Sequence, residues 1–178
     1  MRVIGGEFRS RRLKSIPGLA TRPTPDRLRE TLFDILGAQV LGAVFLDAYA
    51  GTGAVGIEAL SRGAARAVFI ERGKTAAKVL RENLASLGIE SRATVVLGAA
   101  VPLVGRHKAD IVFLDPPYNR EDEYGLVLQI LAEEPPALVI AQHSVRLTLP
   151  ETSGRLSRRR VVRQGDNALS LYSPASRN

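Results

Sequence analysis

The feature that most constrains the fold is the alternation of short apolar runs with longer stretches that have helical periodicity. Runs rich in β-branched and aromatic residues predict strands buried on both faces, and the stretches between them predict amphipathic helices. The predicted strands cover residues 43–49, 67–70, 93–97, 110–114 and 137–141, and the predicted helices cover residues 25–36, 54–62, 75–86 and 121–131. Thr24 is expected to cap the first of these helices. Strands that alternate with helices favour an α/β doubly wound, mostly parallel sheet with right-handed crossovers.

The two ends of the chain add further β structure to this prediction. Residues 156–163 and 168–172 read as two strands around Gly165-Asp166-Asn167, a hairpin that would close the sheet edge and bring it to seven strands. Near the start, Gly5-Gly6 is a turn signal between residues 2–4 and 7–13, which predicts a small N-terminal β-hairpin extension. We therefore expect a basic arm over residues 1–24, part of the same unit, and the main domain over residues 25–178.

Composition narrows the class of protein. The chain has 178 residues, 45% of them hydrophobic, which suits one globular domain. No run approaches the roughly 18 consecutive apolar residues of a membrane span. Cysteine is absent and only two histidines occur, so we expect no disulfide, no metal and a cytoplasmic protein. The net charge of +7 suggests a polyanionic partner such as nucleic acid, and nothing suggests a large apolar interface, so a monomer is expected.

A glycine-rich loop follows the first predicted strand of the sheet. The segment from Asp47 to Gly53 ends that strand, and Gly51, Gly53 and Gly56 satisfy the spacing G-x-G-x-x-G before a helix. Such glycines let the backbone turn tightly and approach a ligand. Glu71 ends the next strand, about 20 residues after the first glycine, where an acid can accept hydrogen bonds from both ribose hydroxyls of a nucleoside cofactor.

The most informative segment is Asp115-Pro116-Pro117-Tyr118-Asn119, which follows the buried strand over residues 110–114. The prolines stop the strand and hold a rigid turn. This turn presents a carboxylate, main-chain carbonyls and an aromatic ring. An exocyclic amino group on a nucleobase needs such acceptors for its two N–H bonds while it attacks an electrophile, and the ring can clamp the base by stacking. If the first and fourth strands are neighbours, this segment and the glycine loop open into one crevice.

These motifs together resemble a class I, Rossmann-like S-adenosylmethionine-dependent methyltransferase that acts on an exocyclic nitrogen. The opening, from Arg2-Val3-Ile4-Gly5-Gly6-Glu7-Phe8-Arg9 to Thr21-Arg22-Pro23-Thr24, resembles the RsmD family specifically. That family methylates guanine N2 in small-subunit (16S) ribosomal RNA.

The resemblance implies a role for each motif. The cofactor would be S-adenosyl-L-methionine, and its binding residues would be Asp47, Ala50, Gly51, Thr52, Gly53, Glu71, Arg72 and Ala99. The catalytic segment would be Asp115, Pro116, Pro117 and Tyr118, and the substrate-binding residues would be Arg9, Arg11, Arg12, Arg22 and Thr24. The partner would be 16S rRNA or an assembling small ribosomal subunit.

Two positions depart from the pattern of such enzymes. Gly98-Ala99-Ala100 lacks the Asp or Asn that often bonds the adenine amino group, so only backbone contact is available there. Gln142 stands where an acidic residue is common at the end of the fifth strand.

Three alternatives stay open at the level of sequence. An adenine-N6 methyltransferase needs the same hydrogen-bond acceptors for its target amine. A nicotinamide (NAD) dehydrogenase uses the same glycines and Glu71. An RNA-binding protein with a vestigial pocket would catalyse no reaction.

Overall fold

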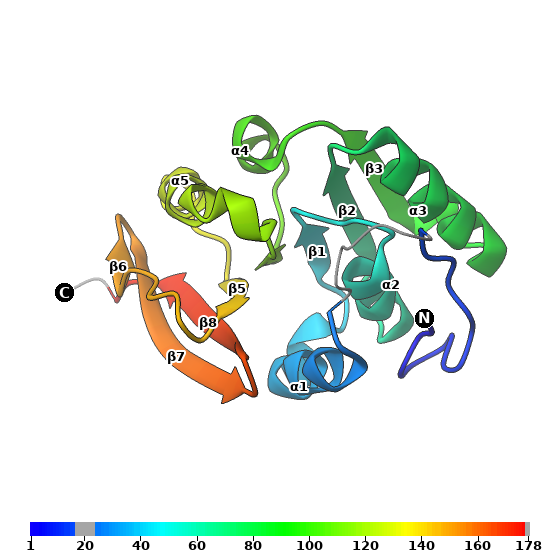
Figure 1. The fold of residues 1–178 in the computed structure, drawn as a ribbon, viewed down its shortest axis with the longest axis horizontal. Helices are drawn as coiled ribbons and strands as arrows, with labels where there is room; N and C mark the ends of the chain where they lie inside the picture. The colour runs from blue at the N-terminus through cyan, green and yellow to red at the C-terminus, as the bar shows by residue number, and fades with distance from the viewer. Residues whose placement is uncertain (17–23, 177–178) are drawn as a thin grey trace.

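A computed structural model describes residues 1–16 and 24–176 of the chain, which fold around a single eight-stranded sheet (Figure 1). The strand order is β3-β2-β1-β4-β5-β8-β7-β6. The strands are β1 (Val44–Asp47), β2 (Arg66–Glu71), β3 (Ala93–Leu97), β4 (Ile111–Leu114), β5 (Leu138–Ser144), β6 (Thr152–Ser153), β7 (Leu156–Gln164) and β8 (Asn167–Pro174).

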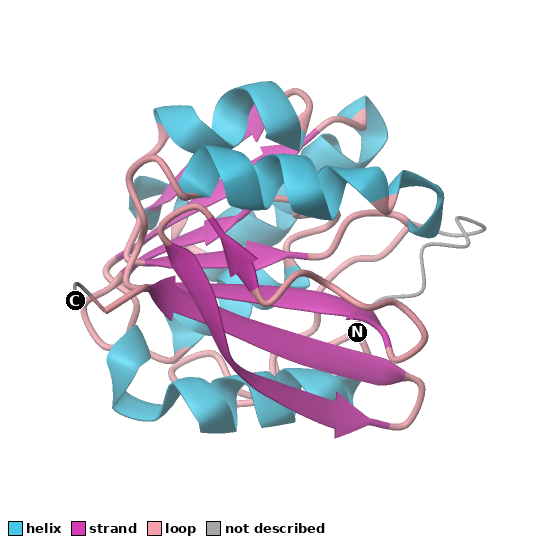
Figure 2. Ribbon diagram, turned by 90° about the vertical axis from the view of Figure 1, so that its left-hand side faces the viewer, coloured by secondary structure: helices cyan, strands magenta, loops and turns pink. Residues whose placement is uncertain are grey.

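Helices cover both faces of the sheet (Figure 2). They are α1 (Asp26–Leu36), α2 (Ala54–Ser61), α3 (Lys74–Leu87), α4 (Ala100–Leu103) and α5 (Asp122–Leu131), with short 3₁₀ turns at Gly37–Val40, Glu90–Arg92, Val104–Arg106 and Tyr118–Arg120. Apolar residues of α1, α2 and α3 share one core cluster, whereas those of α4 and α5 belong to a second cluster. The sheet separates two hydrophobic layers, which confirms the expected doubly wound architecture.

The centre of the parallel part of the sheet is β1, which pairs with β2 on one side and with β4 on the other. The chain first winds outward from β1 through β2 to β3, then crosses to β4 and β5 on the opposite side. The winding therefore reverses between β1 and β4. In sheets of this kind, the loops that leave the two central strands diverge there and open a crevice at the carboxyl edge.

The C-terminal hairpin also forms as predicted. Strand β8 pairs antiparallel with both β5 and β7. The count of seven strands is wrong, however, because a further strand, β6, pairs with the start of β7. β6 has only two residues, too few to produce an alternation of apolar and polar residues in the sequence.

The predicted N-terminal hairpin does not form strands: Arg2 and Arg12 make only an isolated bridge. Next to this bridge, the amides of Val3 and Leu13 donate to the carbonyls of Arg11 and Met1. Beyond it, the backbone bonds to α2. The amides of Ile4 and Gly5 each donate to the Glu58 carboxylate, both over 2.8 Å. That carboxylate is completely buried. Because these amides are used by a helix side chain, they cannot extend a ladder, and the arm lies along the α2 and α3 side of the molecule (Figure 1).

The expected cap of the first helix is also wrong. Helix α1 begins at Asp26 with Pro25 in the capping position, and no side chain makes a cap hydrogen bond there. Thr24 is buried instead and lines a large cavity. Thr24 is therefore part of the cavity wall rather than a helix cap.

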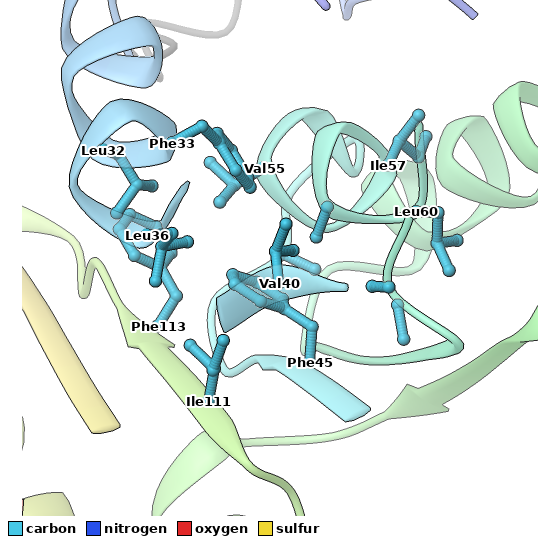
Figure 3. Packing of buried hydrophobic residues seen from close by; sticks show 14 of the residues in the cluster. Leu32, Phe33, Leu36, Val40, Phe45, Val55, Ile57, Leu60, Ile111 and Phe113 are labelled. Carbon is cyan, nitrogen blue, oxygen red and sulfur yellow. The ribbon is translucent and has the colours of Figure 1, made fainter. Parts of the chain in front are cut away.

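The layer beneath α1 and α2 is densely packed around the central strands (Figure 3). Phe33 of α1 stacks on Phe45 of β1, with ring centroids 6.3 Å apart. Gly56 of α2 lies directly against Phe69 of β2, and a Cβ atom at Gly56 would come within 2.3 Å of the aromatic ring. This glycine therefore permits the close approach of helix to sheet that the glycine-rich spacing predicts.

Replacing Gly56 with alanine should destabilise the fold by about 1–3 kcal/mol, because the added methyl overpacks the contact with Phe69. Gly125 is the matched control: it lies inside α5, and nothing occupies the space around an added Cβ. Gly125→Ala should stabilise the protein by about 0.5–1 kcal/mol through helix propensity. Urea unfolding of both variants checks the pair, and equal shifts in the same direction would contradict the packing described here.

Candidate active site

The site is built around a cavity of about 860 Å³ at the carboxyl ends of the central strands. Its walls come from the loops that follow β1, β2, β4 and β5, and from the segment just before α1. The glycine loop and Asp115–Tyr118 both line it, so the expected meeting of these two segments is confirmed. Ala50, Gly51, Thr52, Glu71, Arg72 and Ala99 line it as well, together with Asp47 and Thr24.

The glycine loop takes its shape from two left-handed residues, Gly51 at φ +56° and Gly53 at φ +94°. Gly51 faces the cavity, whereas Gly53 is buried below the loop. A Cβ atom at Gly53 would come within 2.2 Å of a methyl of Leu80. Gly53 thus allows the loop to pack closely on α3 but does not line the cavity. Ala50, Gly51 and Thr52 form the surface that a ligand would contact.

Glu71 is tied to this loop. Its carboxylate accepts the N–H of Gly51 over 2.8 Å and the N–H of Gly73 over 2.6 Å. Each carboxylate oxygen has a second acceptor position, so Glu71 can accept further hydrogen bonds from a guest while it holds the loop. Arg72 lies exposed at the rim beside it, and Ala99 contributes main chain to the neighbouring wall.

Asp47 lies under the loop and is 1% exposed. One carboxylate oxygen accepts the N–H of Gly56 over 3.2 Å, and the other has no hydrogen-bond partner in the described structure. Burial is the largest cause that raises the pKa of Asp47 to about 7. The Gly56 amide opposes this rise, and the negative charges of Asp115 and Glu71 add to it. An unpartnered buried acceptor in a cavity wall is a position that a guest can satisfy.

Asp115 emerges from the end of β4 and is partly exposed to the cavity. Burial of its carboxyl raises its pKa to about 7, and a hydrogen bond from the Thr24 side chain opposes that rise. After Asp115, the chain turns outward: Pro116 is buried and Pro117 is exposed. The Tyr118 side chain is 70% exposed at the cavity rim, so its ring has a free face.

The far wall contains polar residues that sequence reasoning did not assign. The Tyr49 hydroxyl donates to the Glu123 carboxylate over 2.6 Å, and Arg120 forms an ion pair with the same carboxylate. Burial, and then the bond to Glu123, raise the pKa of Tyr49 well above its ordinary range. Tyr49 belongs to the loop segment singled out in the sequence, but Arg120 and Glu123 are 71 and more residues away, and no spacing rule links them.

The basic arm contributes Met1, Ser15 and Ile16 to the cavity wall, but its described arginines do not line the cavity. Arg9, Arg11 and Arg12 are exposed, and Arg11 donates to the backbone carbonyl of Ser86 over 2.8 Å. Arg22 lies outside the described residues. The arm is linked to the glycine loop by buried Asn83, whose side chain donates to the carbonyls of both Lys14 and Thr52. Helix periodicity gave no indication of this link, because Asn83 is the polar residue on an otherwise apolar face.

Three of the acidic residues that line the cavity, Asp47, Glu71 and Asp115, interact through their negative charges. Their mutual repulsion contributes to the raised pKa of Asp47. A guest that carries positive charge, or that develops it during a reaction, would relieve this repulsion. The site is thus suited to a cationic cofactor and to an amino group that gains charge as it reacts.

Metal-binding clusters and membrane-spanning helices are both absent from the described residues. Residues 1–16 and 24–176 contain no group of three or more His, Cys, Asp or Glu side chains placed to hold a metal ion. Within those same ranges, no helix has the length and apolar character that crossing a membrane requires.

The fold and cavity together define a protein of the class I methyltransferase type. The family described as "Conserved hypothetical protein 95" matches residues 1–173, and the chain belongs to this family, which is the RsmD family expected from the sequence. Ribosomal RNA small subunit methyltransferase D of Escherichia coli strain K12 is 38% identical over 179 residues, covering 97% of this chain and 89% of its own. Putative rRNA methyltransferase YlbH of Bacillus subtilis strain 168 is 34% identical over 186 residues, covering 97% and 98%.

Solved structures agree with this assignment. The putative methyltransferase yhhF from Escherichia coli superposes with a TM-score of 0.85 at 34% identity, covering 99% of both chains. An RNA methyltransferase from Salinibacter ruber, solved with S-adenosyl-L-homocysteine, has a TM-score of 0.65 at 22% identity over 88% of this chain and 96% of its own. The second likeness is one of fold.

The raised pKa of Asp47 predicts a pH-dependent stability cost. An acid whose pKa is about 7 when folded and 3.8 when unfolded stabilises the fold fully below pH 3.8, and this contribution is lost as pH rises through 7. Asp47→Asn removes that cost, so the variant should be more stable than the parent at pH 8 by up to about 4 kcal/mol, with the gain shrinking toward pH 4.

Denaturant melts at pH 4, 6 and 8 check this, with exposed Asp34→Asn on α1 as the matched control. A loss of stability that is equal at all three pH values would show that the carboxylate supports the fold instead.

Proposed function

We propose that this protein transfers a methyl group from S-adenosyl-L-methionine to the exocyclic N2 amino group of a guanine in small-subunit (16S) ribosomal RNA. The observation that carries the proposal is the shared cavity: Asp115 and the glycine loop open into the same space, with Asp47 and Glu71 beside them. The names of the relatives point to the same reaction and substrate class.

The residues around the loop fit this cofactor. Glu71 would accept the ribose hydroxyls, because its carboxylate retains acceptor positions beside the bonds to Gly51 and Gly73. Asp47, with one unpartnered oxygen, would hold the positively charged methionine portion. Ala50, Gly51 and Thr52 would contact it through their backbone, Gly53 would shape the loop, and Arg72 and main chain at Ala99 would lie by the adenine. When bound, the cofactor supplies an electrophilic methyl group on a sulfonium sulfur.

Asp115 would activate the target amino group. Its carboxylate and the main-chain carbonyl of Pro116 can accept the two N–H bonds of the guanine N2 amine, which turns the nitrogen lone pair toward the methyl group. As the nitrogen gains the methyl group, these two acceptors would stabilise its developing positive charge and would pass the one proton that it releases to solvent. Pro117 would keep the turn rigid, and the exposed ring of Tyr118 would stack on the base.

The partner would be 16S rRNA or an assembling small subunit, which would place the enzyme in the cytoplasm. Residues 1–24 would serve as a basic RNA-contacting arm of the same unit, and residues 25–178 as the methyltransferase domain. Arg9, Arg11, Arg12 and Arg22 would contact phosphates, and Thr24 would lie at the base subsite. We also propose that the enzyme acts as a monomer, because its large exposed apolar side chains in the described structure come from separate elements.

Asp115→Ala should lower methyl transfer by at least about 100-fold, because a fixed acceptor for the developing charge is lost. RNA affinity should change little, since phosphate contacts dominate it. Transfer of labelled methyl groups and RNA binding by anisotropy measure the two quantities, with Asp34→Ala as the control.

Analysis of the modified nucleosides separates N2-methylguanine from the N6-methyladenine of the rival reaction. Binding of S-adenosylmethionine, compared with binding of NAD, tests the dehydrogenase alternative. Normal turnover by the Asp115 variant would refute the assignment.

The pKa of Asp115 predicts the pH dependence of the reaction. The ionised carboxylate is the form that stabilises the positive charge developing on the amine, so kcat/KM should rise with pH through about 7 and level off above it. Thr24→Val removes the hydroxyl that lowers this pKa, and the rise should move to higher pH.

Thr31→Val is the matched control, because Thr31 lies on α1 and bonds to the Arg27 carbonyl and to Gln164, outside the cavity. Identical pH profiles of kcat/KM for the parent and Thr24→Val would show that Thr24 does not influence the ionisation of Asp115.

A further inference from the structure

The target amino group is only one part of the guanine edge, and the cavity contains a second polar group in position to read the rest. We propose that the side-chain amide of Gln142 pairs with N1–H and O6 of the target guanine, and so makes the enzyme select guanine. This inference rests on the proposed function. Nothing in the glycine loop or in Asp115–Tyr118 distinguishes one nucleobase amine from another, so this selection needs a further residue.

The placement of Gln142 follows from the pairing of β4 with β5. These strands run in parallel with Phe113 opposite Ile140 and Leu114 opposite Ala141. Asp115 and Gln142 are the next residues along each chain. Side chains alternate along a strand, and Phe113 and Ile140 belong to the same core cluster. The side chains of Asp115 and Gln142 therefore leave the sheet on the same face, about one strand spacing (roughly 4.8 Å) apart.

The Gln142 side chain is buried without a partner. The residue is 7% exposed and lines the cavity, yet its amide oxygen has no hydrogen-bond partner in the described structure. Its backbone is fixed, because the Tyr124 hydroxyl donates to the Gln142 carbonyl. The neighbouring His143 is different: its ring bonds to Ser170 over 2.7 Å. Because buried polar atoms without partners are rare, an unsatisfied amide beside the reactive carboxylate indicates a ligand position.

The chemistry of the base complements this amide. On the guanine edge, the N2 amine is followed by the N1–H donor and then by the O6 acceptor. A glutamine amide has one acceptor and two donors, so its oxygen can accept N1–H while its nitrogen donates to O6, in the geometry of a paired amide. When Asp115, after β4, holds the N2 amine, Gln142 on the neighbouring strand β5 can make both of these bonds to N1–H and O6.

Adenine cannot make the same pair. If its N6 amine took the place next to Asp115, the following atom would be the N1 acceptor and the one after that a carbon. Gln142 could donate one bond, but its oxygen would stay buried and unpaired, which is the situation that buried polar sites reject. A carboxylate at position 142 would lose the donor for O6 and would repel the charge of Asp115.

The test compares two bases that both carry a 2-amino group. Small-subunit RNA, ligated from a synthetic segment and assembled with subunit proteins, would carry guanine or 2-aminopurine at the position that the enzyme methylates. 2-Aminopurine lacks both O6 and N1–H. The enzyme variants are the parent and Gln142→Met, which keeps the length of the side chain without its amide. The preference for guanine, measured as a ratio of kcat/KM values, should fall by about 10- to 100-fold in Gln142→Met.

The ratio of the two preferences cancels the different intrinsic reactivity of the two amines, and a purely structural role of Gln142 would slow both bases alike. Gln164→Met on β7, outside the cavity, is the matched control and should keep the parent preference. Thermal melting and S-adenosylmethionine binding check that each variant is folded.

Two results would overturn the proposal in different ways. An unchanged preference in folded Gln142→Met, with N2-methylguanine as the product, removes the role of Gln142 and leaves the function intact. Methylation of adenine by the parent removes the function and the inference together.

Discussion

Phe45 pairs with Ile111, and Asp47 lies opposite Phe113, where β1 and β4 run side by side. These two strands leave the sheet at the same edge, so the segments that follow them must share the space above it. One segment supplies left-handed glycines and backbone N–H groups, and the other supplies a carboxylate and a proline-stiffened turn. Had another strand come between β1 and β4, the same motifs would lie about 10 Å apart, twice the spacing of neighbouring strands.

The cavity combines groups that would be unfavourable in most protein interiors. Two of its acids, Asp47 and Asp115, have pKa values raised to about 7, chiefly by burial. Glu71 is held near them by two amides of its own loops. The fold tolerates this because backbone donors and the packing of α2 against β2 hold the acids in place. Binding sites commonly keep such uncompensated groups, because the guest rather than the fold completes them.

Much of the architecture can be predicted from short-range pattern, and the failures have physical causes. The apolar runs identify β1 to β5, and turn residues identify the β7–β8 hairpin, because burial and backbone conformation are local properties. The N-terminal hairpin stops after one bridge because Glu58, far along the chain, takes the amides that a longer ladder would use. The cap assigned to Thr24 fails for a related reason, since its hydroxyl turns toward Asp115.

The site shows the same division between local and distant information. Asp115, Glu71 and the glycine loop could be predicted because each follows a strand and strand ends converge at one edge. The wall formed by Tyr49, Arg120 and Glu123 could not, because its members meet only after α5 has packed on the sheet. The Gln142 amide oxygen lacks a partner because none of the residues packed around it donates a hydrogen bond to it. Sequence alone does not reveal which residues those are.

Met1 has a consequence for handling the protein. It packs against the core, its carbonyl accepts the amide of Leu13, and it also lines the cavity. Any affinity tag or fusion partner joined ahead of Met1 would emerge beside the cavity. Purification handles are better placed after β8, where the chain leaves the sheet beyond Pro174.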